Sequence, residues 1–144
     1  MELLVFNFLS GTYAIELKKI KVILVYSQTN ITPLYNESPW ISGLINLRGD
    51  VAPIVDLRVR FSDKEPIFTE DTVIIIVKTQ DDKLIGIVVD CIEAIKDIDM
   101  NYITPPPDLG IGINPDYITG LYKNGIDEMI TLLDVDKILN VEEL

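Results

Sequence analysis

A chain of 144 residues with 48% hydrophobic side chains can bury a sizeable core, which favours one ordered domain, or two closely packed subdomains, over disorder. Its 12 basic and 23 acidic residues give a formal net charge of −11, which argues against nucleic acid or an anionic membrane surface as a partner and favours basic partners. The sequence contains no histidine, which removes the most frequent general base and metal ligand and the Ser-His-Asp and Cys-His catalytic schemes.

Several other functional classes are disfavoured by what the sequence lacks. No apolar run approaches the length of a membrane-spanning helix, and no secretion signal is recognisable. No phosphate-binding loop or dinucleotide fingerprint is present. Cys91 is the only cysteine, which agrees with a reducing compartment. We therefore expect a cytoplasmic protein without direct membrane insertion, and we expect no catalytic residue, cofactor or metal site.

Short segments rich in β-branched residues predict strands along most of the chain. Two polar turns, Ser10-Gly11-Thr12 and Gln80-Asp81-Asp82-Lys83, predict hairpins, with Gly11 as the residue suited to a positive φ. The predicted strands are, in chain order, Leu3–Leu9, Tyr13–Leu17, Ile20–Val25, Val51–Val55, Thr72–Thr79, Leu84–Asp90, Ile92–Lys96 and Glu128–Leu133.

Two further patterns concern burial and helix boundaries. The run Val73–Val77 is too uniformly apolar for a sheet with one face in solvent, so we expect it to be buried on both faces at a seam between two barrels. Ser38 before Pro39, and Asn114 before Pro115, predict the starts of short helical turns. Asp134 is predicted to cap a final short helix that extends through Leu139.

The sequence is internally duplicated, because a set of short motifs recurs in the same order. Two copies of one long unit predict two similar small subdomains with a groove between them. We expect an all-β fold of two five-stranded SH3-like barrels packed side by side, with short helical turns. The first sub-barrel is expected over about residues 1–65 and the second over about 70–144, and exchange of end strands between them is left open. The recurring motifs are Tyr13-Ala14-Ile15 with Ile85-Gly86-Ile87, Ile20 and Ile23 with Ile92 and Ile95, Ile31-Thr32-Pro33 with Ile103-Thr104-Pro105, and Ile41-Ser42-Gly43-Leu44 with Ile118-Thr119-Gly120-Leu121.

The least ordinary stretch is Asn46-Leu47-Arg48-Gly49 between two apolar segments, followed by Asp56-Leu57-Arg58. Gly49 can adopt a positive φ, so the motif places an arginine at a tight corner. With Phe6-Asn7-Phe8, Ile103-Thr104-Pro105-Pro106 and Tyr117-Ile118-Thr119-Gly120 in the same order, nearly the whole chain resembles the CheW family of chemotaxis coupling proteins. These proteins share their fold with the regulatory domain of the chemotaxis histidine kinase, which agrees with the duplication.

The resemblance implies a non-enzymatic cytoplasmic adaptor with two partners. One is the cytoplasmic tip of chemoreceptors, and the other is the regulatory domain of the chemotaxis histidine kinase. The resemblance implies a receptor groove between the barrels, whose candidate residues are Ile20, Val22, Ile23, Arg48, Ile85, Ile92 and Ile95. Candidates for the kinase contact are Gly43, Gly49, Thr72, Val73 and Ile74.

One position departs from the family pattern. Val22 stands where the family usually has an acidic residue, which pairs there with the arginine of the Asn-Leu-Arg-Gly turn. We therefore expect Arg48 to contribute little to stability and to face a partner instead.

Two other functions are kept as alternatives. The first is a CheW-like module of another pathway, such as surface motility. The second is a small hydrolase that uses Asp56 and Asp90, although two aspartates at unrelated strand ends are weak evidence for paired acid–base chemistry.

Overall fold

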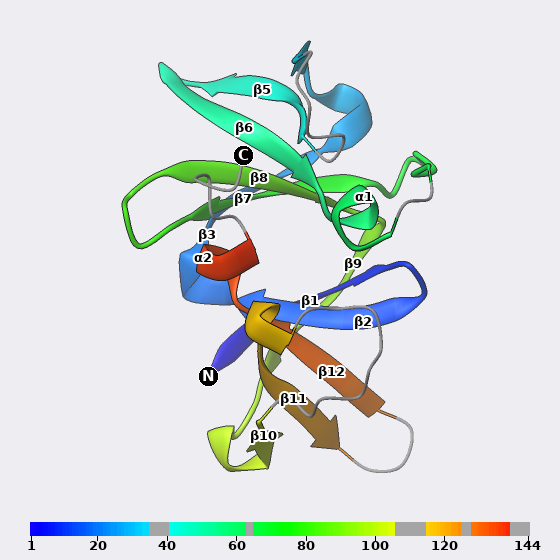
Figure 1. Cartoon of the computed structure of the whole chain (residues 1–144), viewed down its shortest axis with the longest axis vertical. Helices are drawn as coiled ribbons and strands as arrows, with labels where there is room; N and C mark the ends of the chain where they lie inside the picture. The colour runs from blue at the N-terminus through cyan, green and yellow to red at the C-terminus, as the bar shows by residue number, and fades with distance from the viewer. Residues whose placement is uncertain (35–40, 63–64, 106–114, 125–127, 139–144) are drawn as a thin grey trace.

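The computed structural model describes residues 1–34, 41–62, 65–105, 115–124 and 128–138 of the chain (Figure 1). Its strands are, in chain order, β1 (Glu2–Phe8), β2 (Gly11–Glu16), β3 (Ile20–Val25), β4 (Thr32–Pro33), β5 (Ile41–Leu47), β6 (Asp50–Asp56), β7 (Val73–Lys78), β8 (Leu84–Val89), β9 (Cys91–Asp97), β10 (Ile103–Thr104), β11 (Ile118–Asn124) and β12 (Glu128–Leu133). The helices are α1 (Leu57–Phe61), α2 (Val135–Ile138) and the 3-10 turns η1 (Leu17–Lys19), η2 (Tyr26–Gln28), η3 (Met100–Tyr102) and η4 (Pro115–Tyr117).

The strands form two sheets of equivalent topology. One sheet, here called sheet A, has the order β10-β11-β12-β2-β1-β9, and the other, sheet B, has the order β4-β5-β6-β8-β7-β3. In the described part of the chain, each sheet has five long strands and one strand of two residues. The expected mainly β fold of two five-stranded barrels is therefore confirmed.

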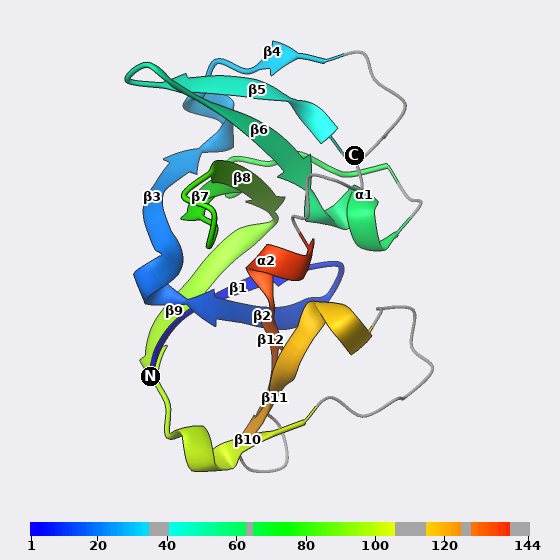
Figure 2. The ribbon, with the colours of Figure 1, turned by 60° about the vertical axis from the view of Figure 1, so that its left-hand side comes forward.

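Each sheet contains a hairpin from the opposite half of the sequence. Hairpin β1–β2 joins sheet A, where β2 runs parallel to β12 and β1 pairs with β9. Hairpin β7–β8 joins sheet B, where β8 runs parallel to β6 and β7 pairs with β3. The chain consequently passes from sheet A to sheet B at β3 and returns from sheet B to sheet A at β9. Figure 2 shows these two crossing strands on the same side of the molecule. The strands of sheet B thus lie within residues 20–89, whereas sheet A combines strands from residues 2–16 and 91–133.

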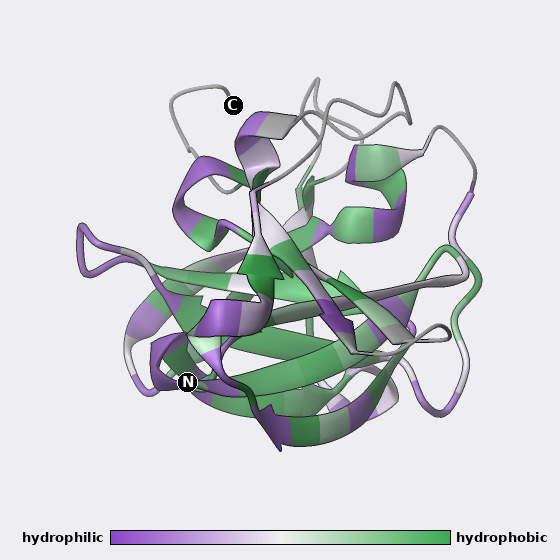
Figure 3. Cartoon of the chain, turned by 90° about the horizontal axis from the view of Figure 1, so that it is seen from below, coloured by the Kyte–Doolittle hydropathy of each residue, from purple (hydrophilic) through white to green (hydrophobic). Residues whose placement is uncertain are grey.

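The core consists of one apolar cluster inside each sheet and a larger one between them. The inter-sheet cluster, here called the seam core, includes Phe6 and Ile15 from sheet A and Ile75 and Ile87 from sheet B. Figure 3 shows hydrophobic residues along the central strands and hydrophilic ones at most loop tips. Burial of apolar side chains at the seam stabilises the contact between the sheets, because each fully buried side chain of this size contributes about 1.5–3 kcal/mol.

The burial predicted for the apolar run Val73–Val77 is confirmed. Ile75 and Val77 belong to the seam core, whereas Ile74 and Ile76 belong to the cluster inside sheet B. These four side chains are fully buried, and Val73 is half-buried against the seam core. Alternation of side chains along β7 thus places one set in each core, which explains why no polar residue interrupts the run.

The predicted C-terminal helix is confirmed at its start. The Asp134 Oδ1 atom accepts hydrogen bonds from the backbone N–H groups of Asp136 (3.1 Å) and Lys137 (3.3 Å), which caps α2. Asn114 and the Ser38-Pro39 pair lie outside the described residues, although a 3-10 turn does begin at Pro115.

Two local features differ from expectation. Phe8 pairs directly with Gly11, so the turn of the first hairpin consists of Leu9 and Ser10. Both of these residues have a positive φ. The assignment of the positive φ to Gly11 was therefore wrong. Helix α1 was not predicted: it begins at Leu57, and the Asp56 carboxylate caps it by accepting from the Arg58 backbone N–H (3.0 Å).

The duplicated glycines have a packing role in both copies. A Cβ atom on Gly43 would collide with the carbonyl oxygen of Thr32, and one on Gly120 would lie 2.8 Å from the Thr104 carbonyl oxygen. Because β4 approaches β5, and β10 approaches β11, this closely, only glycine fits at these positions.

Candidate functional site

The rim of the contact between the sheets exposes apolar side chains of the crossing strands β3 and β9. Residues directly opposite each other in neighbouring strands have their side chains on the same face of the sheet. Ile23 is opposite Ile75, and Ile95 is opposite Leu4, so both face the same way as the seam core. Ile95 is 60% exposed. By the same pairing and by their exposure, the seam rim consists of Ile23, Val25 and Ile95.

A β-bulge in each crossing strand explains the spacing of these isoleucines. In a regular strand, residues three apart point to opposite faces of the sheet. The pairing of β3 with β7 shifts between Ile20 and Val22, and the pairing of β1 with β9 shifts so that Glu93 is the extra residue. Because each bulge adds one residue, Ile20 and Ile23 share the seam-facing side of β3. Ile92 and Ile95 do the same on β9 by an equivalent shift.

The structure divides the seven residues expected in the receptor groove among three places. Ile20 and Ile92 pack against the seam core, and Ile23 and Ile95 are exposed beside it. Ile85 is 1% exposed within the seam core, so it offers no surface to a partner. Val22 and Arg48 lie elsewhere, since the bulge turns Val22 to the face that carries Ile76 of the sheet B cluster. The expectation that all seven line one groove is corrected accordingly.

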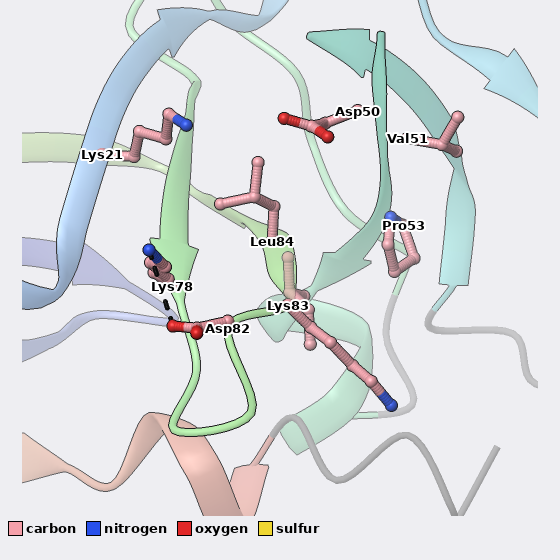
Figure 4. Close-up of a pocket in the computed structure, with 9 residues that line it drawn as sticks. Lys21, Asp50, Val51, Pro53, Lys78, Asp82, Lys83 and Leu84 are labelled. Carbon is pink, nitrogen blue, oxygen red and sulfur yellow. Dashed lines mark ion pairs between the residues drawn. The ribbon is translucent and has the colours of Figure 1, made fainter.

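Val22 and Arg48 line the same hollow at one end of sheet B, with a volume of about 470 Å³. A second hollow of about 440 Å³ shares Lys21 and Asp50 with it (Figure 4). In Figure 4 the Lys21 and Asp50 side chains point into the space between β3 and the β5–β6 hairpin. The residues that line the first hollow are Lys21, Val22, Leu24, Leu47, Arg48 and Asp50.

Arg48 sits at the corner expected from the sequence. Leu47 pairs with Asp50, so the turn contains only Arg48 and Gly49, whose φ angles are +52° and +92°. Two positive φ angles in a two-residue hairpin loop match the twist of the flanking strands. The Asn46 Oδ1 atom accepts a hydrogen bond from the Gly49 N–H (2.9 Å), which fixes the turn. Among the described residues Arg48 has no ion-pair partner within 4.0 Å, so its charge is free to meet a ligand.

The residues expected at the kinase contact do not form one exposed surface. Gly43, Thr72 and Ile74 are buried, and Thr72 Oγ1 accepts a hydrogen bond from the Thr69 N–H (2.9 Å). Val73 is half-buried, and Gly49 is exposed at the hairpin tip. Burial leaves the first three without a surface for a partner, so among these five residues only Gly49 and Val73 are accessible to one.

A buried ionic network, whose role the sequence did not reveal, connects the two sheets. The Arg58 guanidinium is 2% exposed and binds the Asp56 carboxylate through Nε (2.9 Å) and Nη2 (2.8 Å). Its Nη1 atom also donates to Asp90 Oδ1 (3.1 Å) and to the Ile67 carbonyl oxygen. The other Asp90 oxygen accepts from the Leu9 N–H in the turn between β1 and β2 (3.3 Å).

The charge balance of this network favours the ionised arginine. Burial by itself would lower the pKa of the Arg58 guanidinium, but hydrogen bonding to Asp56 and the charges of Asp56 and Asp90 outweigh that effect and raise it. Arg58 therefore remains charged at every physiological pH. The sequence feature that could have indicated this network is the Asp-Leu-Arg triplet at the end of an apolar strand. Two opposite charges beside a core segment have to neutralise each other when they are buried.

Two similar β-barrels that expose apolar side chains along their common seam are typical of a protein-interaction module. None of the described helices has the length and apolar character needed to cross a membrane. The family described as CheW-like domain matches residues 2–143.

Individual relatives agree with this match. The chemotaxis protein CheW of Klebsiella aerogenes is 34% identical over 143 residues, covering 99% of this chain and 84% of that protein. The Bacillus subtilis CheW is 28% identical over 98% of this chain and 88% of its own length. The crystal structure of the scaffolding protein TtCheW from Thermoanaerobacter tengcongensis superposes with a TM-score of 0.84 at 28% identity, covering 95% of this chain and 86% of that one. The chain belongs to the CheW-like family of chemotaxis adaptor proteins.

Proposed function

We propose that this chain is a cytoplasmic, non-enzymatic adaptor that couples chemoreceptors to the chemotaxis histidine kinase. The observation that carries the proposal is the seam rim, an exposed apolar strip on a domain of the CheW-like family. Coupling of this kind requires no chemical step. It requires that both partners bind in one geometry, so that each shifts the equilibrium of the other.

The seam rim is the proposed receptor contact. A helical receptor tip would place its apolar face along β3 and β9, with Ile23 and Ile95 as exposed anchors. Ile20 and Ile92 support these anchors from below, because both pack against the seam core. Binding to such a strip is expected to depend on a few apolar residues near its centre.

The kinase contact is proposed at the tip of the β5–β6 hairpin around Gly49, because Val73 pairs with Val25 of the seam rim at the opposite end of sheet B. We expect an interface of standard size or smaller, roughly 1,200–2,000 Å² in total or below, that rests on apolar contacts more than on charge. Kinase binding should therefore change little between low and moderate salt, because screening acts mainly on exposed charges.

Reconstitution tests the proposal. Purified chain, chemotaxis kinase and receptor fragment are combined, and kinase activity is measured with and without the chain. We expect receptor-dependent control of the kinase only when the chain is present, and we expect Ile95→Glu to abolish it.

Met129→Glu is the matched control, because Met129 is also an exposed apolar strand residue of sheet A but lies on β12. If the chain alters kinase activity neither with nor without receptor, the adaptor function is wrong. If Ile95→Glu and Met129→Glu behave alike, the seam rim is not the receptor contact.

A further inference from the structure

The segment between α1 and β7 presents two large apolar side chains to solvent. Ile67 is 78% exposed and Phe68 is 47% exposed. We call these two neighbouring residues the connector ledge. Exposed apolar residues are ordinary when they are scattered and flexible, and informative when they are adjacent and fixed in place.

The connector ledge is held in place from beneath by the buried ionic network. The Arg58 guanidinium donates to the Ile67 carbonyl oxygen and lies 4.6 Å from the centre of the Phe68 ring. The Phe68 ring also stacks on Tyr26, with centroids 4.5 Å apart and an interplanar angle of 25°. A buried cation and an aromatic ring thus fix an apolar side chain that remains half in solvent.

The backbone after the ledge is tethered as well. The Thr69 N–H donates to Thr72 Oγ1 (2.9 Å), and the Thr72 N–H donates back to the Thr69 carbonyl oxygen (3.3 Å). The Thr72 carbonyl oxygen in turn accepts from the Tyr26 N–H (3.0 Å) at the end of β3. A side chain that is already ordered loses little conformational entropy when a partner binds it, so this arrangement favours recognition.

Acidic side chains flank the ledge on both sides. Glu65 precedes it, and Glu70 and Asp71 follow it, and all three are exposed. In the part of the chain that the structure describes, none of the three carboxylates forms an ion pair within 4.0 Å. Their negative charges are therefore available to a cationic ligand, because no basic side chain among the described residues already pairs with them.

We propose that the connector ledge is a docking surface for a protein segment that carries apolar residues flanked by lysine or arginine. The apolar residues of that segment pack on Ile67 and Phe68, and its cations pair with Glu65, Glu70 and Asp71. Nucleic acid does not fit, because its phosphates would meet three unneutralised carboxylates. The surface is distinct from the seam rim, and only the identity of the protein that supplies the segment rests on the proposed adaptor function.

The first test uses a synthetic peptide in which two leucines are flanked by lysines, titrated into isotope-labelled protein and followed by NMR. We expect saturable shifts at residues 65–72 and at Tyr26, and an affinity that falls as salt is added. Phe68→Ala and Ile67→Ala should each weaken binding about fivefold to tenfold. Neutralisation of all three acids, as Glu65→Gln, Glu70→Gln and Asp71→Asn, should weaken it at least fivefold. Met129→Ala is the matched control and should bind as the wild type does.

The outcomes separate cleanly. Ile67→Ala removes a side chain that is mostly in solvent, so its folding is secure even if Phe68→Ala proves unstable. Absence of saturable binding at millimolar peptide, shifts confined to other acidic surfaces, or equal binding by Ile67→Ala and wild type would each overturn the proposal. A peptide with alanine in place of both leucines should bind at least fivefold more weakly, and equal binding would reduce the surface to nonspecific charge and overturn it too. Because the peptide assay contains neither kinase nor receptor, failure of the adaptor function leaves its result unaffected.

Discussion

Replacement of Arg58 by methionine should be among the most destabilising single changes on this protein that leave the apolar core intact. The variant removes the two hydrogen bonds to Asp56, at 2.9 and 2.8 Å. Among the described residues, the 2% exposed carboxylate then keeps only the backbone N–H of residue 58 as a hydrogen-bond donor. Removal of one partner of a buried ion pair typically costs about 3–5 kcal/mol, because the other charge remains buried and uncompensated. Domains of this kind have total stabilities of about 5–15 kcal/mol.

The contact with Asp90 should contribute much less. The Asp90 side chain is 44% exposed, so water replaces Arg58 when the contact is lost. Asp90→Asn is therefore expected to cost less than about 1 kcal/mol. The double variant Asp56→Asn with Arg58→Met should recover more than half of the loss, since it removes the buried charge and keeps a side-chain oxygen that can cap α1.

Urea unfolding followed by circular dichroism measures all three values. For a slope of about 2 kcal/mol/M, a loss of 3–5 kcal/mol lowers the unfolding midpoint by roughly 1.5–2.5 M. If Asp90→Asn costs as much as Arg58→Met, or if the double variant is no more stable than Arg58→Met alone, the destabilisation does not arise from an uncompensated buried carboxylate.

The remaining predictions concern the hollow, a close backbone approach and a buried phenol. Arg48→Ala should change the melting temperature by less than about 4 °C, because Arg48 is exposed and unpaired among the described residues. The same variant should weaken receptor-dependent activation of the kinase. Full activation by the folded variant would show that Arg48 does not face a partner. Val22→Glu should fold normally, since Val22 is 37% exposed in the same hollow as Arg48, and a loss of the cooperative thermal transition would place it in the core instead. Gly120→Ala should lower the stability by roughly 1–3 kcal/mol in urea unfolding, because its Cβ would lie 2.6 Å from Ile103 Cγ2; an unchanged midpoint would mean that β10 moves freely. Burial raises the pKa of Tyr13 above its ordinary 10.0, so the unfolded chain loses this proton at a lower pH than the folded protein does. The free energy of unfolding should therefore fall as the pH rises above 10.0 and towards the higher pKa of the folded state. The decline should be smaller in Tyr13→Phe, and an identical decline in the two proteins would argue against the raised pKa.

The sequence predicted features that depend on local pattern and missed those that depend on pairing. Uniform apolarity of Val73–Val77 was sufficient to predict burial on both faces, because side-chain alternation is a property of any strand. The sequence shows that Ile92 and Ile95 are three residues apart, but it does not show that both point to the same face of the sheet. Only the register with β1 reveals the bulge that brings them to one face. The same reason explains why Val22 and Ile85 were expected beside Ile23. Bulges and sheet partners are set by contacts distant in sequence, which a single strand does not encode.

Helix α1 and the connector ledge illustrate a second kind of miss. A helix of five residues is too short to show a helical period, and its start depends on the Asp56 side chain accepting from the Arg58 backbone N–H. The segment after it carries Glu65, Glu70 and Asp71, and charged residues of this kind by themselves indicate only a solvated surface. Its two apolar side chains acquire meaning only with Arg58 and Tyr26 around them.

The exchanged hairpins have a consequence for how the molecule folds and fails. Sheet A requires residues near both ends of the chain, because β2 pairs with β12 and β1 with β9. During synthesis, hairpin β1–β2 must wait for β9 and β12 before its sheet is complete, and pairings this distant in sequence are formed slowly. A chain cut between α1 and β7 would yield two pieces that each lack a hairpin, so neither should fold alone while the mixture should reassemble. The same connectivity offers a second copy of the chain as a donor of the missing hairpin, which makes domain-swapped dimers the characteristic misfolded product at high concentration.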